Sequence, residues 1–336
     1  MFGLWLFYLV RADYQLAGQL GDQLMTLAQR LQEPVLLLAA HQVQGINCFY
    51  LGELTLARTH LEQALELYRP EQAAGRFSYS GADQGVATLS HLALTLWLLG
   101  YPDQALQQAE AALALAERLA HPFSQAFALS MAALLHQYRR EGQLAQARAE
   151  AALAYAAGQG FELLAGFSAI FRGWALAEQG QVELGMSQLR QGLDAFRATG
   201  AELGQLHFLA LLAETYGRAG QVEAGLSLLE EALAAAHDKG ERFYEAELYR
   251  LKGELLRQAG QQSAPAASFQ KAIQVARSQS ARLLELRAAL HLSRLWAAQG
   301  QPAKARELLA GSYNWFTEGF ETADLRDAKA LLASLG

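Results

Sequence analysis

The phrase GQVExG occurs twice in this chain of 336 residues, at 180–185 and at 220–225, so that 40 residues separate the two copies. A glycine inside a helix costs about 1 kcal/mol relative to alanine, yet the leucines and alanines around both copies keep a helical spacing. Self-similarity at a fixed period of about 20 to 50 residues is the signature of repeat architectures. The two copies therefore indicate stacked copies of one helical unit.

Glycines of similar phrases extend this register along the chain, 38 to 48 residues apart. These anchors are Gly52, Gly100, Gly142, Gly180, Gly220, Gly260 and Gly300. Small residues recur five and twelve positions after nearly every anchor and seven before it. Around Gly142 these positions hold Ala147, Ala154 and, as an exception, Leu135. The pattern predicts that the period belongs to the structure.

The repeated small residues have a physical role in a helical hairpin. The turn between two antiparallel helices needs a residue that tolerates a left-handed backbone, which glycine adopts without a Cβ penalty. Close approach of the two helices requires a small side chain where they cross. All 6 prolines fall at predicted helix ends, where a missing N–H does no harm. No stretch alternates convincingly with period two, so essentially no strand is predicted.

Small residues at these three offsets are typical of tetratricopeptide (TPR) repeats, although the period is nearer 40 than 34. HEAT-like repeats share the period and are the alternative. We predict an all-α, right-handed α-solenoid of about eight extended TPR-like hairpins in a single domain, because one hairpin cannot bury its apolar face alone. The predicted units are 1–31, 34–69, 86–120, 122–158, 160–199, 201–239, 241–279 and 281–316, with a closing helix at 322–335.

Composition and motifs argue against several classes of function. A net charge of −6 gives no electrostatic footprint for a nucleic-acid binder. The single cysteine, Cys48, suits a reducing compartment and is interpreted as a small buried hydrophobic residue rather than a nucleophile. The apolar start MFGLWLFYLV is too short to span a bilayer. The common phosphate-binding, hydrolase and metal motifs are absent, and the 8 histidines are scattered. We expect a cytoplasmic protein that is not an enzyme and uses no cofactor or metal.

If the fold is right, a ligand binds the concave groove that the first helices line. The groove should run from aromatic to densely charged. Trp174 offers a flat wall, and Glu247/Arg250 and Glu254/Arg257 are spaced to pair with each other. Arg139 and Arg140 lack an acidic residue three or four positions earlier, and Glu141 is adjacent rather than facing, so they are the better ligand candidates. The predicted groove residues are Tyr50, Trp97, His136, Arg139, Arg140, Trp174, His207, Glu214, Arg218, Arg250, Arg257, Arg287 and Arg294.

Four stretches carry a resemblance to a known family: LTLWLLGYPDQAL (94–106), ATGAELGQLHFLALLAETYGRAGQ (198–221), GERFYEAELYRLKGELL (240–256) and WFTEGFETADLRDAKALL (315–332). They resemble the C-terminal repeat region of bacterial proteins that join a class III adenylate/guanylate cyclase domain and an AAA-type ATPase domain to a long TPR tail. That tail is similar to the sensor domain of MalT-type activators. The resemblance implies a regulatory module that biases an upstream ATPase or cyclase. The cyclase and ATPase parts are absent here, so no catalytic residue carries over.

Two function hypotheses remain open. The first is a sensor coupled to an upstream signalling domain, which takes a small-molecule effector near Arg139, Arg140 and Trp174. The second is a stand-alone adaptor that holds a peptide or protein partner along several units. We expect no direct contact with nucleic acid or a membrane. The apolar, uncapped start predicts self-association or docking of an upstream domain through residues 1–31, and the polar connection at 70–85 is a candidate functional loop.

Overall fold

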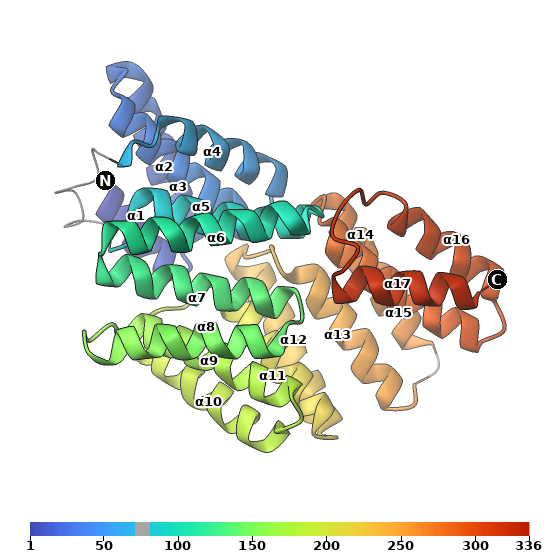
Figure 1. Cartoon of the computed structure of the whole chain (residues 1–336). Coiled ribbons are helices and arrows are strands. Elements are labelled where there is room, and N and C mark those ends of the chain that lie inside the picture. The colour runs from blue at the N-terminus through green and yellow to red at the C-terminus, as the bar shows by residue number, and fades with distance from the viewer. Residues whose placement is uncertain (71–80, 262, 336) are drawn as a thin grey trace.

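The computed structural model describes residues 1–70, 81–261 and 263–335, and no strand occurs in these ranges (Figure 1). The helices follow one another as hairpins: α1 (Phe2–Val10) and α2 (Tyr14–Leu31); α3 (Pro34–Tyr50) and α4 (Leu54–Leu67); α5 (Gln84–Leu99) and α6 (Pro102–Leu119); α7 (Pro122–Tyr138) and α8 (Gly142–Ala157); α9 (Glu162–Glu178) and α10 (Val182–Ala198); α11 (Gln205–Arg218) and α12 (Val222–Lys239); α13 (Glu245–Gln258) and α14 (Ala264–Ser278); α15 (Arg282–Ala298) and α16 (Pro302–Tyr313). A last helix, α17 (Ala323–Ser334), follows them. The predicted all-α solenoid is confirmed.

Within each hairpin one residue with positive φ makes the turn between the two helices. These residues are Ala12, Gly52, Gly100, Arg140, Gly180, Gly220, Gly260 and Gly300. The assignment of Gly142 to this role is therefore wrong, because Gly142 is the first residue of α8 and the left-handed residue of its hairpin is Arg140, with φ 61°. A non-glycine residue pays about 1–2 kcal/mol in this conformation, which is why the sequence pattern favoured the nearby glycine.

With Arg140 as the turn residue, the repeat is more regular than the sequence pattern predicts. Counted from Arg140, the three small positions of the fourth hairpin hold Ala133, Ala145 and Ala152, and each is 0% exposed. The predicted Ala147 is exposed instead. From Gly100 onwards the turn residues are spaced by 40 residues without exception.

The small residues lie where paired helices come closest. A Cβ atom on Gly185 of α10 would lie 2.5 Å from the carbonyl oxygen of Gly173 on α9. One on Gly192 would lie 2.8 Å from the backbone nitrogen of Ile170. Because real Cβ atoms do not approach backbone atoms this closely, a larger residue at either position would push α9 and α10 apart.

The solenoid also makes contact with itself across a superhelical turn. The carbonyl of Val10, at the end of α1, accepts hydrogen bonds from the amides of Glu202 (2.8 Å) and Leu203 (3.1 Å), which precede α11. The carbonyl of Tyr50, at the end of α3, accepts one from the amide of Arg242 (2.8 Å), which precedes α13. Each pair joins hairpins that are five apart in sequence. The concave surface is therefore divided and partly filled rather than left as an open channel.

The candidate loop at 70–85 falls largely on residues 71–80, which lie outside the described residues. Met1, before α1, and Leu4 and Phe7 on α1 are each 50% exposed, and self-association through residues 1–31 stays a prediction. No helix among the described residues is long and apolar enough to cross a membrane.

Candidate ligand-binding surface

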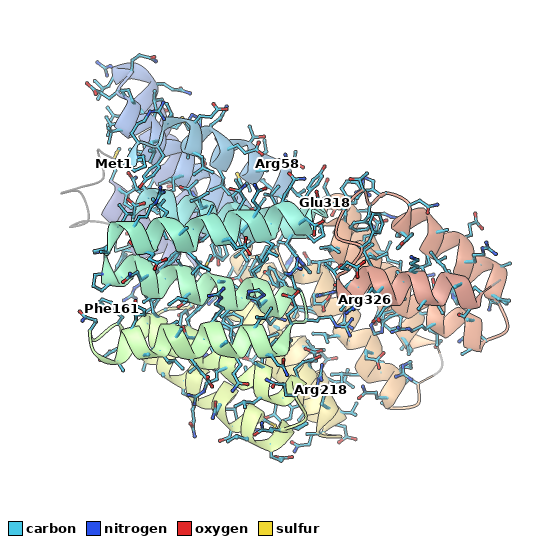
Figure 2. The ribbon with its side chains drawn as sticks, viewed as in Figure 1. Met1, Arg58, Phe161, Arg218, Glu318 and Arg326 are labelled. Atoms are coloured by element: carbon cyan, nitrogen blue, oxygen red, sulfur yellow. The ribbon has the colours of Figure 1, made fainter. Side chains whose placement is uncertain are left out.

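The first helices of the hairpins line a concave surface that is divided along the helix axes. In α7, Phe123 and Phe127 line an apolar cavity of about 370 Å³, whereas Gln137 lines a separate charged cleft of about 260 Å³. The same division holds in α9, where Phe167 lines the cavity and Trp174 the cleft. In Figure 2, Phe161 just before α9 lies at the left edge of the molecule, whereas Arg218 at the end of α11 lies near its middle. The expected aromatic and charged parts of the groove are therefore two distinct sites.

Six helices contribute to the charged cleft: α7, α9, α11, α13, α15 and α17. Its charged and polar lining residues are Gln137, Arg140, Trp174, Glu178, Glu214, Arg218, Glu247, Arg250, Glu254, Gln258, Arg287, His291, Arg294, Asp324 and Asp327. The cations are paired within the cleft. Arg218 of α11 pairs with Glu178 of the neighbouring α9 and with Glu214 of its own helix, at 3.3 Å from Glu214. Ion pairs between neighbouring hairpins thus line the cleft.

The most deeply buried cation is Arg287 of α15. Its guanidinium donates to the carboxylate of Asp324 (2.8 Å) and to the carbonyl of Tyr138. It also lies over the ring of Trp97, with Cζ 4.8 Å from the centroid. Arg287 therefore joins α5, α7, α15 and α17. Removing only one partner of a buried ion pair such as Arg287–Asp324 lowers the free energy of unfolding by several kcal/mol.

Burial and neighbouring charges set the ionisation of the cleft. Burial works against a charge on Glu247, but Arg250 and Arg287 outweigh it and lower the pKa of this carboxyl to about 2. Burial lowers the pKa of His291, against the opposing effect of Glu254. At neutral pH the cleft therefore presents fixed carboxylates and guanidinium groups.

Three buried polar atoms in the cleft have no hydrogen-bond partner among the described residues. They are Nε1 of Trp174, Nε of Arg250 and Oε2 of Glu247. The side chains that carry them are 3%, 7% and 4% exposed, and all three line the cleft. An unsatisfied buried polar group costs about 1–3 kcal/mol. Together these atoms are two N–H donors and one acceptor, so a ligand that has both a carbonyl oxygen and an N–H can complement them.

The structure corrects the interpretation of the two preferred arginines. Glu141 does face Arg139: Nε donates to its carboxylate at 3.0 Å, and Nη1 donates to the carbonyl of Pro102 at 2.9 Å. Arg139 therefore ties two hairpins together and does not line the cleft. Arg140 does line it, but it pairs with Asp324 (3.3 Å) and Asp327 (3.1 Å) of α17, beside the end of α7 (Figure 1). Neither acidic residue is near in sequence.

Three further predicted groove residues line neither site. Trp97 is 1% exposed and stacks on Tyr138 in the core, with ring centroids 4.6 Å apart. His136 is buried and its Nδ1 is 2.6 Å from the Glu141 carboxylate. Arg257 is half-exposed and is paired with Glu254 at 2.6 Å. Trp97 and His136 are thus buried side chains that face neither the cavity nor the cleft.

The remaining predicted residues divide between the two sites. Tyr50 and His207 line the apolar cavity. Trp174, Glu214, Arg218, Arg250, Arg287 and Arg294 line the charged cleft with Arg140. Their part in ligand binding stays a prediction. The expected pairing of Glu247 with Arg250 and of Glu254 with Arg257 is confirmed, as is the burial of Cys48.

Sequence reasoning missed Asp324 and Asp327, although the acidic first turn of α17 was visible in the predicted closing helix. It also missed most of the apolar cavity, whose aromatic side chains cannot be told from core residues by their spacing. Those side chains include Phe123, Phe127, Phe167, Phe196, Phe208 and Phe243.

The chain matches no protein-family profile. The uncharacterized protein R02095 of Rhizobium meliloti (strain 1021) is 26% identical to it over 216 residues, which make up 64% of this chain and 21% of that protein. The chain thus spans about a fifth of the length of this curated relative.

Several solved structures are similar to the chain in fold. A Rap protein complexed with competence and sporulation factor has a TM-score of 0.63 at 11% identity, over 99% of this chain and 96% of that one. NprR in complex with its cognate peptide NprX has a TM-score of 0.57 at 15% identity, over 85% and 81%. Aspartyl phosphate phosphatase F from Bacillus subtilis has a TM-score of 0.55 at 12% identity, over 93% and 92%. At such identities the likeness shows the fold alone: this chain is a TPR-like helical solenoid.

Proposed function

We propose that this chain is a regulatory module without catalytic activity that binds a peptide in its charged cleft. The observation that carries the proposal is the set of unpartnered atoms on Trp174, Arg250 and Glu247. One backbone peptide group of a ligand offers a C=O acceptor and an N–H donor, which complement these atoms. The likeness to NprR in complex with its cognate peptide supports the same class of ligand.

Arg140 adds a second line of support. Its hairpin is one of two that use a residue other than glycine at the turn, and residues held in costly backbone conformations cluster at functional sites. Its side chain is 41% exposed while pairing with Asp324 and Asp327. An acidic group on the ligand can therefore reach this guanidinium from solvent.

The test begins with selection of heptapeptides from a phage-displayed library on the immobilised chain. Binding of the selected peptides is then measured by titration calorimetry on Trp174→Phe and Arg140→Ala. Trp174→Phe removes the free N–H and keeps an aromatic ring, so we expect a loss of about fivefold to tenfold in affinity, as for one hydrogen bond. Arg326→Ala, an exposed arginine on α17 (Figure 2), is the matched control for Arg140→Ala. Selected peptides that bind all variants equally would contradict a peptide site in this cleft.

The relation to an upstream ATPase or cyclase remains a finer proposal. The similar segment of the Rhizobium protein lies within a much longer polypeptide, which supports a solenoid that acts on attached domains. The test is ATP hydrolysis and cyclic-nucleotide formation by the polypeptide that carries this solenoid in the cell, with and without a selected peptide. Equal rates in both conditions would contradict the coupling.

A hydrolytic function is the competing possibility, because one structure of similar fold is named an aspartyl phosphate phosphatase. Hydrolysis of acetyl phosphate by the purified chain tests it directly. We expect the rate to equal that of buffer, and a rate that falls on denaturation of the chain would contradict the binding-only proposal.

A further inference from the structure

The apolar cavity has features that neither the fold nor the peptide cleft accounts for. Its volume of about 370 Å³ is within the range of about 300–1,000 Å³ typical of small-molecule sites. Among the residues that the structure describes, no lysine, arginine, aspartate or glutamate lines it, whereas aromatic rings from five of the first helices do. Because burying an unpaired charge is costly, this cavity selects for an uncharged occupant.

One wall of the cavity carries hydrogen-bond acceptors. Nδ1 of His91 is 2.8 Å from the carbonyl of Ala87 and must therefore carry the proton, which leaves Nε2 of the neutral ring as an acceptor. Nε2 of His207 donates to the side-chain carbonyl of Gln137 at 2.8 Å, which leaves its Nδ1 as an acceptor. Burial lowers the pKa of His91 to about 4 and that of His207 to about 3, so both rings are neutral at physiological pH. Neither free ring nitrogen has a hydrogen bond to another described residue.

The two histidines belong to one continuous aromatic wall. Tyr50 lies between them, 6.4 Å from His91 by ring centroids and 5.5 Å from Phe243. Phe243 in turn is 6.3 Å from His207. The helix α1 also lines the cavity, through Phe2, Trp5, Leu6, Leu9 and Val10. The cavity thus combines a few polar atoms with a largely apolar lining.

A layer of buried side chains separates this cavity from the charged cleft. Tyr138 and Tyr244 stack with ring centroids 5.7 Å apart and an interplanar angle of 12°. Both are at most 1% exposed. His207 lies 4.3 Å from Tyr244 and faces the cavity side, while its partner Gln137 faces the cleft. A peptide in the cleft would have to displace this layer to reach the cavity.

From these contacts we propose that the apolar cavity is a second binding site, for an uncharged small molecule with an apolar body and one hydroxyl or N–H group. The apolar body packs against the phenylalanine side chains and α1. The donor group hydrogen-bonds to the free ring nitrogen of His91, which is the more exposed of the two rings (7% against 1% for His207). The site is separate from the peptide cleft.

Three probes of one shape test the chemistry: 1-naphthol, naphthalene and 1-naphthoate. Equilibrium binding to the whole chain is followed by fluorescence and by calorimetry. We expect 1-naphthol to bind saturably and about fivefold to tenfold more tightly than naphthalene, because only the naphthol donates a hydrogen bond. 1-Naphthoate should bind at least tenfold more weakly than 1-naphthol. Equal binding of the three probes would overturn the proposal.

Variants locate the site and separate it from the cleft. His91→Phe keeps the shape of the ring and removes the acceptor, and Met131→Trp fills the cavity, so each should weaken 1-naphthol binding at least fivefold. His237→Phe, at an exposed position, is the matched control. Circular dichroism and thermal unfolding establish whether each variant is folded. If Met131→Trp does not fold, His91→Phe alone tests the site. Trp174→Phe should leave 1-naphthol binding unchanged.

Two results would overturn this assignment whatever the fate of the peptide cleft. One is 1-naphthol binding that both cavity variants leave intact. The other is displacement of 1-naphthol by a peptide selected on the cleft, which would mean that the peptide's own side chain occupies the cavity.

Discussion

Glu241 provides a quantitative test of how the two superhelical turns hold together. It lies in the segment before α13, is 2% exposed, and accepts a hydrogen bond at 2.6 Å from the hydroxyl of Tyr14 at the start of α2. Burial raises the pKa of its carboxyl to about 7, although the hydrogen bond from Tyr14 opposes the shift. The substitution Glu241→Gln keeps the shape and removes the titration.

The sign of the effect follows from proton linkage. Between the unfolded pKa near 4.5 and the folded pKa near 7, the folded chain keeps a proton that the unfolded chain releases. The contribution of Glu241 to stability is therefore fully present below pH 4.5 and is lost as the pH rises through 7. Each pKa unit corresponds to 1.36 kcal/mol, so the shift is worth about 3 kcal/mol. Glu241→Gln should gain about this much relative to the wild type between pH 4.5 and pH 8.

The assay is urea unfolding followed by tryptophan fluorescence at several pH values, with the two chains compared at each pH. Groups common to both chains cancel in the difference. Glu231→Gln, at an exposed position on α12, is the control and should show no such trend. A difference between wild type and Glu241→Gln that stays constant from pH 4.5 to pH 8 would refute the reasoning.

Three further predictions concern packing, buried charge and the thiol. Gly185→Ala should destabilise the chain by about 2 kcal/mol because its Cβ atom would meet the backbone of α9. Gly18→Ala, with no atom within 4 Å of its Cβ, should instead stabilise it by up to about 1 kcal/mol. Urea unfolding measures both changes in the free energy of unfolding, and changes of the same sign would contradict the close approach. Arg287→Leu should cost about 3 kcal/mol, because it removes the buried partner of Asp324 and leaves that carboxylate only its longer contact to Arg140. A double variant that also carries Asp324→Leu should recover part of this loss in the same assay. Burial raises the pKa of Cys48 to about 12, so its thiol should react with a disulfide reagent at pH 8 only after unfolding; fast reaction of the native chain would show that the thiol is accessible.

The sequence alone determined the period, the hairpins and their small contact residues. This was possible because the interactions responsible lie within one hairpin or between neighbours, so the same residue types recur every 40 residues. Its one error of register arose at Arg140, where the backbone adopts the conformation that glycine usually supplies. The pairing of Glu247 with Arg250 could also be predicted, because it depends only on helical spacing.

The tertiary structure decided which hairpins meet across a superhelical turn. The small rotation between successive hairpins accumulates over five of them before α1 reaches the segment at 202–203 and Arg140 reaches Asp324. No local pattern records that sum, since it depends on how every intervening pair of helices packs. A rotation accumulated over three hairpins brings Tyr138 onto Tyr244 and so divides the concave surface into an apolar cavity and a charged cleft.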